Sequence, residues 1–225
     1  MTLIRKGSLV VSAQAREDNP LHGPIYMAAM ALAARDGGAS TIRANGPEDI
    51  AAIKAVCDLP IIGISKLWDA RFPVYITPNR ATADKIKAAG AEIIGIDATQ
   101  RPRDGGPVEE LIAYIRDDLK CEVFADVDTL ENGLKAAAAR PTYVATTMAG
   151  YTDETEARKG SGPDFELLEA LVRATDIPVV AEGRFWEPSQ VARALELGAH
   201  AVVIGTAITN PRDITRRFVT ESGAC

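Results

Sequence analysis

Histidine and cysteine are scarce in this sequence of 225 residues, and each scarcity excludes a kind of site. The two histidines, His22 and His200, are too few for a metal site built from several imidazoles, although a carboxylate site for magnesium stays open. The three cysteines, Cys57, Cys121 and Cys225, are far apart and outside any CxxC spacing. We therefore expect neither a disulfide framework nor a zinc site made of thiolates.

Positive charge and long apolar runs are also in short supply. The formal net charge is -6, whereas a protein that binds nucleic acid or anionic lipid usually presents a basic patch. No apolar run approaches the roughly 18 residues that cross a bilayer. The N-terminus, MTLIRKGSLVVSAQ, lacks the apolar core and cleavage site of a signal peptide. We expect a small-molecule ligand, no nucleic acid, no membrane partner and a cytoplasmic location.

The sequence does contain a regular alternation of short apolar runs and helical patterns. A helical pattern follows each apolar run, and several of these patterns open with Pro, Thr or Asp and close with Gly. One further β-like piece, PVYITP at residues 73–78, is expected to form a lid-like loop. The apolar runs predict eight strands near residues 8–15, 41–44, 61–66, 92–99, 121–127, 143–148, 178–184 and 201–207.

Eight β/α units in a chain of this length predict an α/β fold, a single (β/α)8 TIM barrel near the short end of its size range. The central runs are apolar at consecutive positions, as parallel strands buried on both faces are. We expect one domain over residues 1–225, with a frayed tail at about 221–225. A doubly wound sheet is the alternative, but no GxGxxG follows the first strand and no change in composition marks a second domain.

Polar residues occur at the end of every expected strand. In a TIM barrel these ends and the loops after them form the active face. One such residue alone would be an ordinary exposed strand end, but their convergence on one rim predicts an active site. The residues are Gln14, Arg43, Lys66, Asp97, Asp126, Thr146, Thr147, Glu182, Arg184 and Thr206.

The ends of the seventh and eighth expected strands, AEGR and IGTA, indicate an anion site. Glycines let an anion approach backbone N–H groups, and the loops after these two strands often bind phosphate in this fold. The alternative is that the glycines only allow tight turns. The candidate phosphate-binding residues are Gly183, Arg184, Gly205 and Thr206, with Gly150 and Tyr151 of MAGYT closing the same cup.

Lys66 and Glu182 end the third and seventh expected strands, so both side chains can face one ligand. Such a pair suits removal of a proton next to a carbonyl group. An unperturbed lysine, with a pKa near 10.4, is a poor base at neutral pH, so burial or the nearby Arg43 and Arg184 would have to keep Lys66 neutral. A purely electrostatic contact of Lys66 with phosphate or carboxylate is the alternative.

Several motifs, in order along nearly the whole chain, carry a resemblance to a known family. They are VSAQA, NPLH, RANGPEDI, IIGISK, PVYITP, IIGIDAT, TTMAGYT, PVVAEGR and ALELGAHAVVIGTAIT. These motifs resemble the N-acetylmannosamine-6-phosphate 2-epimerase family. A generic barrel of the ribulose-phosphate-binding type would share only the phosphate cup. The motifs RANG, PVYITP and AEGR are typical of a much narrower group of proteins.

The resemblance implies an isomerase without metal or nucleotide cofactor. It would interconvert N-acetylmannosamine 6-phosphate and N-acetylglucosamine 6-phosphate at the second carbon of the sugar, in sialic-acid and amino-sugar catabolism. It also implies that Lys66 is the catalytic lysine and Glu182 its acidic partner. The candidate substrate-binding residues are Gln14, Arg43 and Asp126 from the resemblance, and Asp97, Thr147 and Tyr151 from their place on the rim.

One position departs from the family pattern. After the last strand the family commonly reads AITRP, and this chain reads AITNP, with Asn210 in place of the arginine. The expected assembly is a homodimer, with exchange of the last helix between the two copies as one form of it. The usual arginine would act at that contact or on the substrate. Arg212, two positions further on, is the candidate substitute.

Other functions on the same barrel stay open at this point. A metal-dependent pentose-phosphate epimerase would need more histidines at strand ends than the chain has. A Schiff-base aldolase could use the same lysine. A non-catalytic phosphosugar-binding protein would keep the phosphate cup, but the presence of both Lys66 and Glu182 argues against it.

Overall fold

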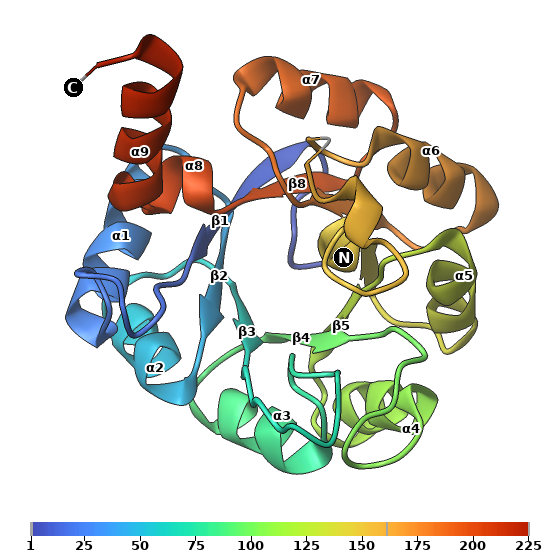
Figure 1. Cartoon of the computed structure of the whole chain (residues 1–225). Coiled ribbons are helices and arrows are strands. Elements are labelled where there is room, and N and C mark those ends of the chain that lie inside the picture. Colours follow the sequence, from blue (N-terminus) through green and yellow to red (C-terminus); the bar gives the residue numbers. More distant parts are fainter. Residues whose placement is uncertain (1, 161, 225) are drawn as a thin grey trace.

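The computed structural model describes residues 2–160 and 162–224, and its strands close into a barrel (Figure 1). Each strand pairs in parallel with the next in sequence, and β8 pairs with β1 to complete the circle. The predicted (β/α)8 TIM barrel is therefore confirmed, and the doubly wound sheet is wrong. The strands are β1 (Ser8–Ala13), β2 (Thr41–Asn45), β3 (Ile61–Ile64), β4 (Ile93–Asp97), β5 (Glu122–Asp126), β6 (Tyr143–Ala145), β7 (Val179–Glu182) and β8 (Ala201–Ile204).

Helices surround the barrel (Figure 1). Proline occupies the first turn of four of them, α1, α2, α7 and α9, where its missing N–H has no intrahelical partner to lose. A π-helical turn, Tyr114–Asp118, extends α4, and a 3-10 turn, Glu156–Arg158, lies in the loop before α6. The helices are α1 (Pro24–Asp36), α2 (Pro47–Val56), α3 (Arg80–Ala88), α4 (Val108–Ala113), α5 (Leu130–Ala138), α6 (Phe165–Ala174), α7 (Pro188–Glu196), α8 (Thr206–Thr209) and α9 (Pro211–Ser222).

Alternate residues of each strand face the inside and the outside of the barrel. The outward side chains are mostly isoleucine, valine and alanine and pack against the helices. The register places Arg43 beside Ile62, and Asp97 beside Asp126, on the inward face. The polar rim therefore stands on a packed apolar interior. That interior is formed by Ile4, Val10, Ile62, Ile93, Phe124, Tyr143, Ala145, Val180, Ala201 and Val203.

Two glycines within strands mark close approaches. A Cβ atom on Gly95 of β4 would lie 2.6 Å from Ile64 Cγ2, so the missing side chain makes room for Ile64 inside the barrel, next to Arg43. A Cβ atom on Gly63 of β3 would lie 2.4 Å from Ile86 Cγ2. Gly63 therefore allows α3 to pack closely on the outer wall.

All the strands except β2 end earlier than the apolar pattern predicts, and two of these ends bear on the site. β3 ends at Ile64 rather than at residue 66, and β6 ends at Ala145 because Thr146–Met148 forms a 3-10 turn. Lys66 and Thr147 consequently lie just beyond their strands, at the rim of the barrel. Apolar runs do not reveal these ends, because Ser65 directly after β3 and Thr146 directly after β6 are also at least partly buried.

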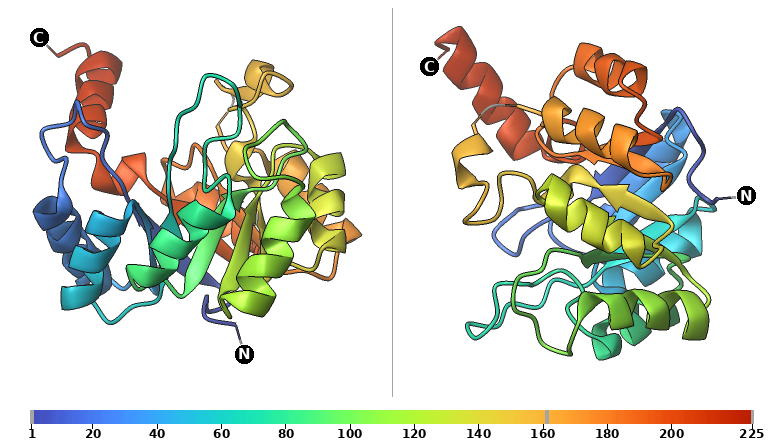
Figure 2. Two further views of the ribbon diagram at one scale, coloured as in Figure 1. Left: turned by 90° about the horizontal axis from the view of Figure 1, so that it is seen from below. Right: turned by 90° about the vertical axis from the view of Figure 1, so that its right-hand side faces the viewer.

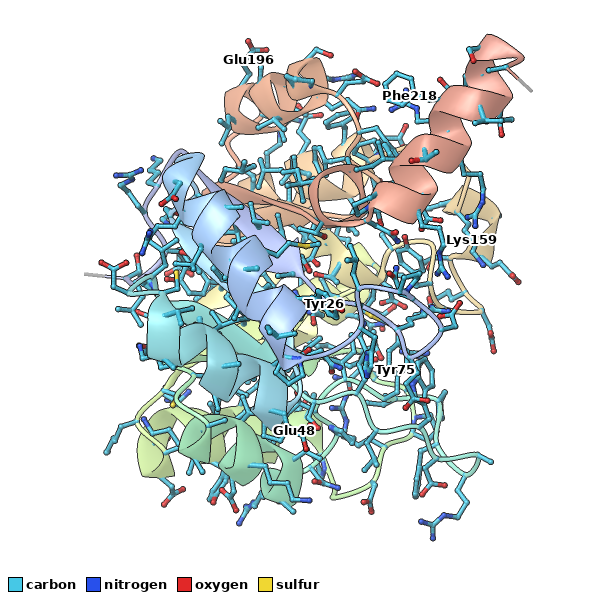
Figure 3. The ribbon with its side chains drawn as sticks, turned by 90° about the vertical axis from the view of Figure 1, so that its left-hand side faces the viewer. Tyr26, Glu48, Tyr75, Lys159, Glu196 and Phe218 are labelled. Atoms are coloured by element: carbon cyan, nitrogen blue, oxygen red, sulfur yellow. The ribbon has the colours of Figure 1, made fainter. Side chains whose placement is uncertain are left out.

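The segment PVYITP, residues 73–78, is not a free lid. It folds back antiparallel on the end of β3, where Ile76 pairs with Lys66 and the N–H of Thr77 donates to the carbonyl of Ser65 at 2.8 Å. Val74 and Ile76 of this segment are buried, and Ile76 packs with Ile64 at the end of β3. Figure 3 shows Tyr75, within this segment, among the loops at one end of the molecule.

The C-terminal helix α9 projects from the barrel (Figures 1 and 2), and no residue of α9 is buried. Phe218 on α9 is 70% exposed (Figure 3). The helix continues to Ser222 and ends at Gly223, whose φ of 68° is left-handed. Two residues of the predicted frayed tail, Glu221 and Ser222, are thus helical, and Cys225 lies outside the described residues.

Candidate active site

Arg43 of β2 is the centre of a buried ion cluster at the mouth of the barrel. Its Nη1 and Nη2 lie 2.9 and 2.6 Å from the two carboxylate oxygens of Asp126, and Nη1 lies 2.6 Å from Glu182 Oε2. The side chain of Arg43 is 1% exposed. Burial alone would lower the pKa of Arg43, but the two carboxylates raise it, so the guanidinium stays charged. The two strands opposite β2 thus supply its partners.

Glu182, at the end of β7, is held on both its backbone and its carboxylate. Its N–H donates to Thr146 Oγ1 at 3.0 Å, and Thr147 Oγ1 donates to Glu182 Oε2 at 3.1 Å. Burial raises the pKa of Glu182, although Arg43 opposes this shift, and the neighbouring Asp126 adds to it. The carboxyl group therefore takes up a proton more readily than an ordinary glutamate does.

Lys66 faces the same mouth from the end of β3. Its backbone N–H donates to Asn45 Oδ1 at 2.9 Å, its Nζ donates to Gln14 Oε1 at 2.8 Å, and Gln14 in turn donates to Ser12 Oγ at 2.8 Å. The residue as a whole is exposed, whereas its ammonium group lies among the strand ends, bound to Gln14. Burial, with Arg43 as the next cause, lowers the pKa of Lys66 to about 8. A substantial fraction is therefore neutral near pH 7 to 8.

Asp97, predicted to bind substrate, has its carboxylate occupied within its own loop. Oδ1 accepts hydrogen bonds from the N–H and the hydroxyl of Thr99, at 3.0 and 2.7 Å. Oδ2 accepts from Arg101 Nη2 at 2.5 Å, and Arg103 Nη1 donates to the backbone carbonyl of Asp97 at 2.7 Å. The structure thus places Asp97 as the anchor of the loop between β4 and α4, beside the cluster of Arg43.

The expected phosphate residues follow two neighbouring strands, β7 and β8. Gly183 has a φ of 114° and Arg184 a φ of 60°, so the chain turns sharply directly after β7. Gly183 is required there because other residues rarely adopt such a φ. Gly205 precedes the short helix α8, which begins at Thr206. The two turns therefore lie side by side on the rim.

Arg184 is enclosed by the loop between β6 and α6. Its Nη1 donates to the carbonyl of Ala149 and its Nε to the carbonyl of Gly162. The guanidinium lies 5.9 Å from the ring centroid of Tyr151. A Cβ atom on Gly150 would lie 2.6 Å from Arg184 Nη1, so Gly150 makes room for the guanidinium. The structure thus brings Gly150, Tyr151 and Arg184 together, as expected.

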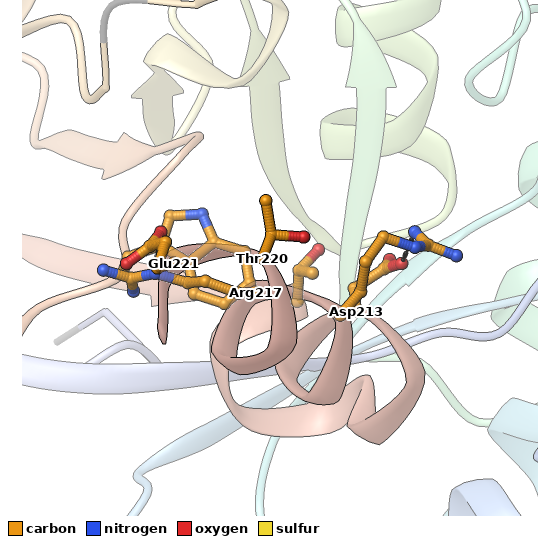
Figure 4. A pocket seen from close by; sticks show the side chains of 7 residues that line it. Asp213, Arg217, Thr220 and Glu221 are labelled. Atoms are coloured by element: carbon orange, nitrogen blue, oxygen red, sulfur yellow. Dashed lines mark hydrogen bonds and ion pairs between the residues drawn. The ribbon is translucent and has the colours of Figure 1, made fainter. Parts of the chain in front are cut away.

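An open cavity of about 380 Å³ lies next to this region, between α9 and the loop after β7 (Figure 4). Arg217 crosses it, with Nη2 2.7 Å from Glu187 Oε1 and its guanidinium 4.9 Å from the Trp186 ring centroid. Neither Lys66 nor Glu182 lines this cavity. The catalytic candidates lie at the barrel mouth instead. The lining residues are Trp186, Thr206, Asp213, Arg216, Arg217, Thr220 and Glu221.

Comparison with known proteins gives the family. A family model described as "Putative N-acetylmannosamine-6-phosphate epimerase" matches residues 27–224. The chain belongs to this family. A "Putative N-acetylmannosamine-6-phosphate 2-epimerase" of Caldanaerobacter subterraneus is 46% identical, covering 98% of this chain and 94% of the relative. A protein of the same description from Clostridioides difficile is 44% identical, covering 95% of each chain. The resemblance read from the motifs is confirmed.

Solved structures agree with this family assignment. The structure described as the N-acetylmannosamine-6-phosphate 2-epimerase from Clostridium perfringens superposes with a TM-score of 0.93 at 42% identity, covering 97% of this chain and 94% of the other. A thiamine phosphate pyrophosphorylase from Pyrococcus furiosus gives a TM-score of 0.64 at 19% identity, covering 98% of each chain. The second likeness concerns the fold alone.

Asn210, the departure from the family pattern, serves as the N-cap of α9. Its side chain accepts from the N–H of Asp213 at 3.3 Å and donates to Asp213 Oδ2 at 2.6 Å. It also accepts from Asn19 Nδ2 at 3.3 Å, which ties α9 to the loop after β1. The proposed substitute, Arg212, is bound to Asp18 at 3.1 Å in that same loop. Neither side chain reaches the cluster of Arg43.

Sequence reasoning missed residues that hold the candidates in place. Asn45 positions the backbone of Lys66, and Ser12 positions Gln14. Asn45 and Ser12 lie two residues from Arg43 and Gln14, on the same inward face. This spacing of two residues could have identified Asn45 and Ser12 from the sequence. Thr146, by contrast, was predicted on the rim, and it holds the backbone N–H of Glu182 from the neighbouring strand end.

Within residues 2–160 and 162–224, no group of three or more His, Cys, Asp or Glu side chains is arranged to hold a metal ion. Among these same residues no helix is long and apolar enough to cross a membrane.

Proposed function

We propose that this chain is an isomerase that interconverts N-acetylmannosamine 6-phosphate and N-acetylglucosamine 6-phosphate. The observation that carries the proposal is a lysine with a lowered pKa, Lys66, at the same barrel mouth as the cluster of Arg43, Asp126 and Glu182. The names of the relatives support this substrate pair. The reaction removes the proton from one face of the sugar's second carbon and returns a proton to the opposite face, so it needs no net oxidation or reduction.

Lys66 is the base in this proposal. In its neutral form it removes the proton next to the aldehyde of the open-chain sugar, and negative charge develops on the aldehyde oxygen. Gln14, which binds the Nζ atom of Lys66, keeps the amine directed into the mouth. The lowered pKa matters because a base is most effective when its pKa lies near the working pH.

Glu182 is the group proposed to act on the oxygen. Arg43 is held between two carboxylates, and Asp126 accepts two hydrogen bonds from it, so both are committed to structural partners. Glu182 is 14% exposed and has a raised pKa, which favours a carboxyl group that can share a proton with the developing oxyanion. Arg43 then supplies fixed positive charge nearby.

The other rim residues are proposed to bind the rest of the substrate. Thr147 and Tyr151 border Glu182 and Arg184, and are proposed to contact the sugar together with Gln14. Asp97 is proposed to act indirectly, by anchoring the loop after β4. The phosphate is proposed to bind at Gly150, Gly183, Arg184, Gly205 and Thr206, where the two neighbouring turns present backbone N–H groups.

A homodimer is proposed as the assembly, with α9 packed on, or exchanged with, a second copy. Phe218 and Val219 of α9 are 70% and 45% exposed, and Ile25 and Tyr26 at the start of α1 are 76% and 45% exposed. Exposed apolar side chains that form a contiguous patch mark an interaction site. Light scattering is expected to give twice the chain mass, and Phe218→Asp to reduce it to one chain. A phosphorylated sugar does not cross membranes freely, so we also propose a cytoplasmic location.

The decisive experiment follows N-acetylmannosamine 6-phosphate by NMR in deuterated buffer. Wild-type protein is expected to form N-acetylglucosamine 6-phosphate with deuterium at the second carbon. Lys66→Met is expected to slow both conversion and exchange by about three orders of magnitude. Lys135→Met is the matched control, since Lys135 pairs with Glu131 on the outer surface of α5. It should behave as wild type.

Each alternative function predicts a different experimental outcome. Undiminished exchange in Lys66→Met would contradict the role of Lys66. Covalent trapping of substrate on Lys66 by borohydride would indicate the Schiff-base aldolase. Tight binding of the product sugar without conversion or exchange by the wild type would indicate a phosphosugar-binding protein.

A further inference from the structure

Asp128 carries a buried carboxylate that the proposed chemistry does not use. It lies two residues beyond β5, and it is 1% exposed. Its Oδ1 accepts from Asn132 Nδ2 of α5 at 2.7 Å, and its Oδ2 accepts from Thr152 Oγ1 at 2.8 Å. Thr152 belongs to the loop between β6 and α6. Asp128 therefore joins the base of α5 to the loop that encloses Arg184.

The hydroxyl groups beyond Asp128 form a chain with one direction. Thr152 has a single hydroxyl proton and gives it to the carboxylate, which only accepts when ionised. The 2.8 Å bond between the hydroxyls of Thr152 and Thr155 must then be donated by Thr155. The hydroxyl of Thr155 accepts in turn from the N–H of Gly150 at 2.9 Å. The chain thus runs from Gly150 through Thr155 and Thr152 to Asp128, and bonds in such a chain strengthen one another.

The end of this chain lies directly against Arg184. The peptide that gives the Gly150 N–H to Thr155 also contains the Ala149 carbonyl, which accepts from Arg184 Nη1. Fixing one side of this peptide plane fixes the other. Gly150 itself leaves the space that the guanidinium fills. With Nη1 and Nε bound to backbone carbonyls, Nη2 is the nitrogen of Arg184 that no contact among the described residues occupies.

We propose that Asp128 is a positioning residue for phosphate recognition, acting through Thr152, Thr155 and the peptide before Gly150 on the guanidinium of Arg184. This inference rests on the proposed phosphate-binding role of Arg184. Asp128 does not touch the substrate. Its loss frees the peptide between Ala149 and Gly150, so that Arg184 is no longer held toward the phosphate.

The expected kinetic effect is confined to binding. A phosphate remote from the reacting carbon is held equally in the ground state and the transition state, so weaker phosphate binding raises KM and leaves kcat unchanged. Asp128→Asn and Thr152→Val are each expected to raise KM roughly tenfold, the size of one charge-assisted hydrogen bond. Thr152→Ser keeps the hydroxyl and should restore the wild-type KM.

Thr142→Val is the matched control for the loss of a hydroxyl. Thr142 Oγ1 accepts from the N–H of Val123 at 3.1 Å at the opposite end of the barrel. Its removal should lower thermal stability to a similar degree and leave KM and kcat unchanged. If Thr142→Val raised KM as much as Thr152→Val, the effect would be general destabilisation and the proposal would be wrong.

A double-mutant cycle separates positioning from structure. The dissociation constant of N-acetylglucosamine 6-phosphate is measured by NMR titration for wild type, Thr152→Val, Arg184→Met and the double variant. If Thr152 acts through Arg184, its effect on affinity disappears in the Arg184→Met background. Equal effects of Thr152→Val in both backgrounds would overturn the proposal, as would unchanged affinity in Arg184→Met.

The cycle needs only binding, so it is independent of turnover. A wild-type protein that binds the ligand without converting it would refute the proposed epimerase activity. The coupling between Thr152 and Arg184 would still be decided by the four dissociation constants. Among these variants, Asp128→Asn carries the greatest risk of a folding defect, because it changes a buried carboxylate. Thr152→Val tests the same chain of bonds without removing that carboxylate.

Discussion

The two ends of the barrel bury polar side chains in opposite ways. At the N-terminal end, the first residues of the chain close the barrel, and Tyr143 accepts from the N–H of Ile4 at 2.9 Å and donates to Glu122 Oε2 at 2.7 Å. His200 Nε2 lies 2.8 Å from the carbonyl oxygen of Ile4. Burial raises the pKa of Tyr143, so its hydroxyl keeps the proton that it donates. Every group in this network has a partner from the chain itself.

At the mouth, by contrast, full charges are buried and their pairing is incomplete. The Nε of Arg43 has no hydrogen-bond partner within the part of the chain that the structure describes. The pKa of Lys66 is lowered and that of Glu182 is raised, by burial in both cases. Buried charge is costly, and perturbed pKa values concentrate at functional sites. The difference between the ends follows the division of a TIM barrel into a stabilising face and an active face.

Among the predicted substitutions, removal of Arg43 is expected to cause the largest losses of stability and turnover. Arg43→Met leaves the carboxylates of Asp126 and Glu182 buried without their counter-ion. The free energy of unfolding should fall by about 3–5 kcal/mol, and turnover should be lost with it. Urea unfolding and the NMR assay measure the two effects.

The control for Arg43→Met is an exposed ion pair. Arg140 pairs with Asp176 at 3.0 Å, and both side chains are largely exposed. Arg140→Met should change the free energy of unfolding by about 0.5 kcal/mol or less and leave turnover unchanged. Equal losses of stability in the two variants would mean that the mouth is not a region of buried charge.

Loss of the Tyr143 hydroxyl is expected to have an intermediate effect, on stability alone. Tyr143→Phe leaves the N–H of Ile4 and the carboxylate of Glu122 without their shared partner. Such a loss costs about 1–3 kcal/mol of unfolding free energy. kcat and KM should not change, because the network lies at the end of the barrel opposite Lys66.

Tyr114→Phe is the control, since the hydroxyl of Tyr114 donates to Asp84 at an exposed position. It should leave the free energy of unfolding nearly unchanged. A several-fold fall in kcat for Tyr143→Phe, without any such fall for Tyr114→Phe, would show that the two ends of the barrel are coupled.

The same contrast explains how much could be predicted from the sequence. Lys66, Arg43, Asp126 and Glu182 were predicted correctly at one rim because parallel strands bring their ends together and alternate residues face inward. This argument uses only the order of strands and the period of two. It therefore predicts the position of side chains that lie on a strand or one or two residues beyond it, and it does not predict their partners.

The argument fails where residues of a loop supply the hydrogen-bond partners. Asp97 lies at a strand end as predicted, but Thr99 and Arg101 of the following loop occupy its carboxylate, and loop direction is set by tertiary contacts. The segment PVYITP was expected to form a lid and instead pairs with the end of β3. Asp128 was not predicted to be a functional residue, because its partners Thr152 and Asn132 come from two other elements.

The smallest expected effect tests the electrostatics of the mouth directly. The positive charge of Arg16 disfavours the protonated form of Lys66 and is one of the causes that lower its pKa, after burial and Arg43. Arg16→Ala should therefore raise the pKa of Lys66 from about 8 by a fraction of a unit. Because neutral Lys66 is the proposed base, the acidic limb of kcat/KM should move to higher pH, and activity on that limb should fall.

The pH profile also separates this charge effect from a loss of shape. Arg16 is exposed, so its influence should weaken as salt screens it, and the profiles of Arg16→Ala and wild type should converge at high ionic strength. Arg16→Lys keeps the charge and should retain the wild-type limb. A limb that moves to lower pH in Arg16→Ala, or moves equally in Arg16→Lys, would contradict Lys66 as the titrating base, because removing a nearby cation can only raise the pKa of an ammonium group.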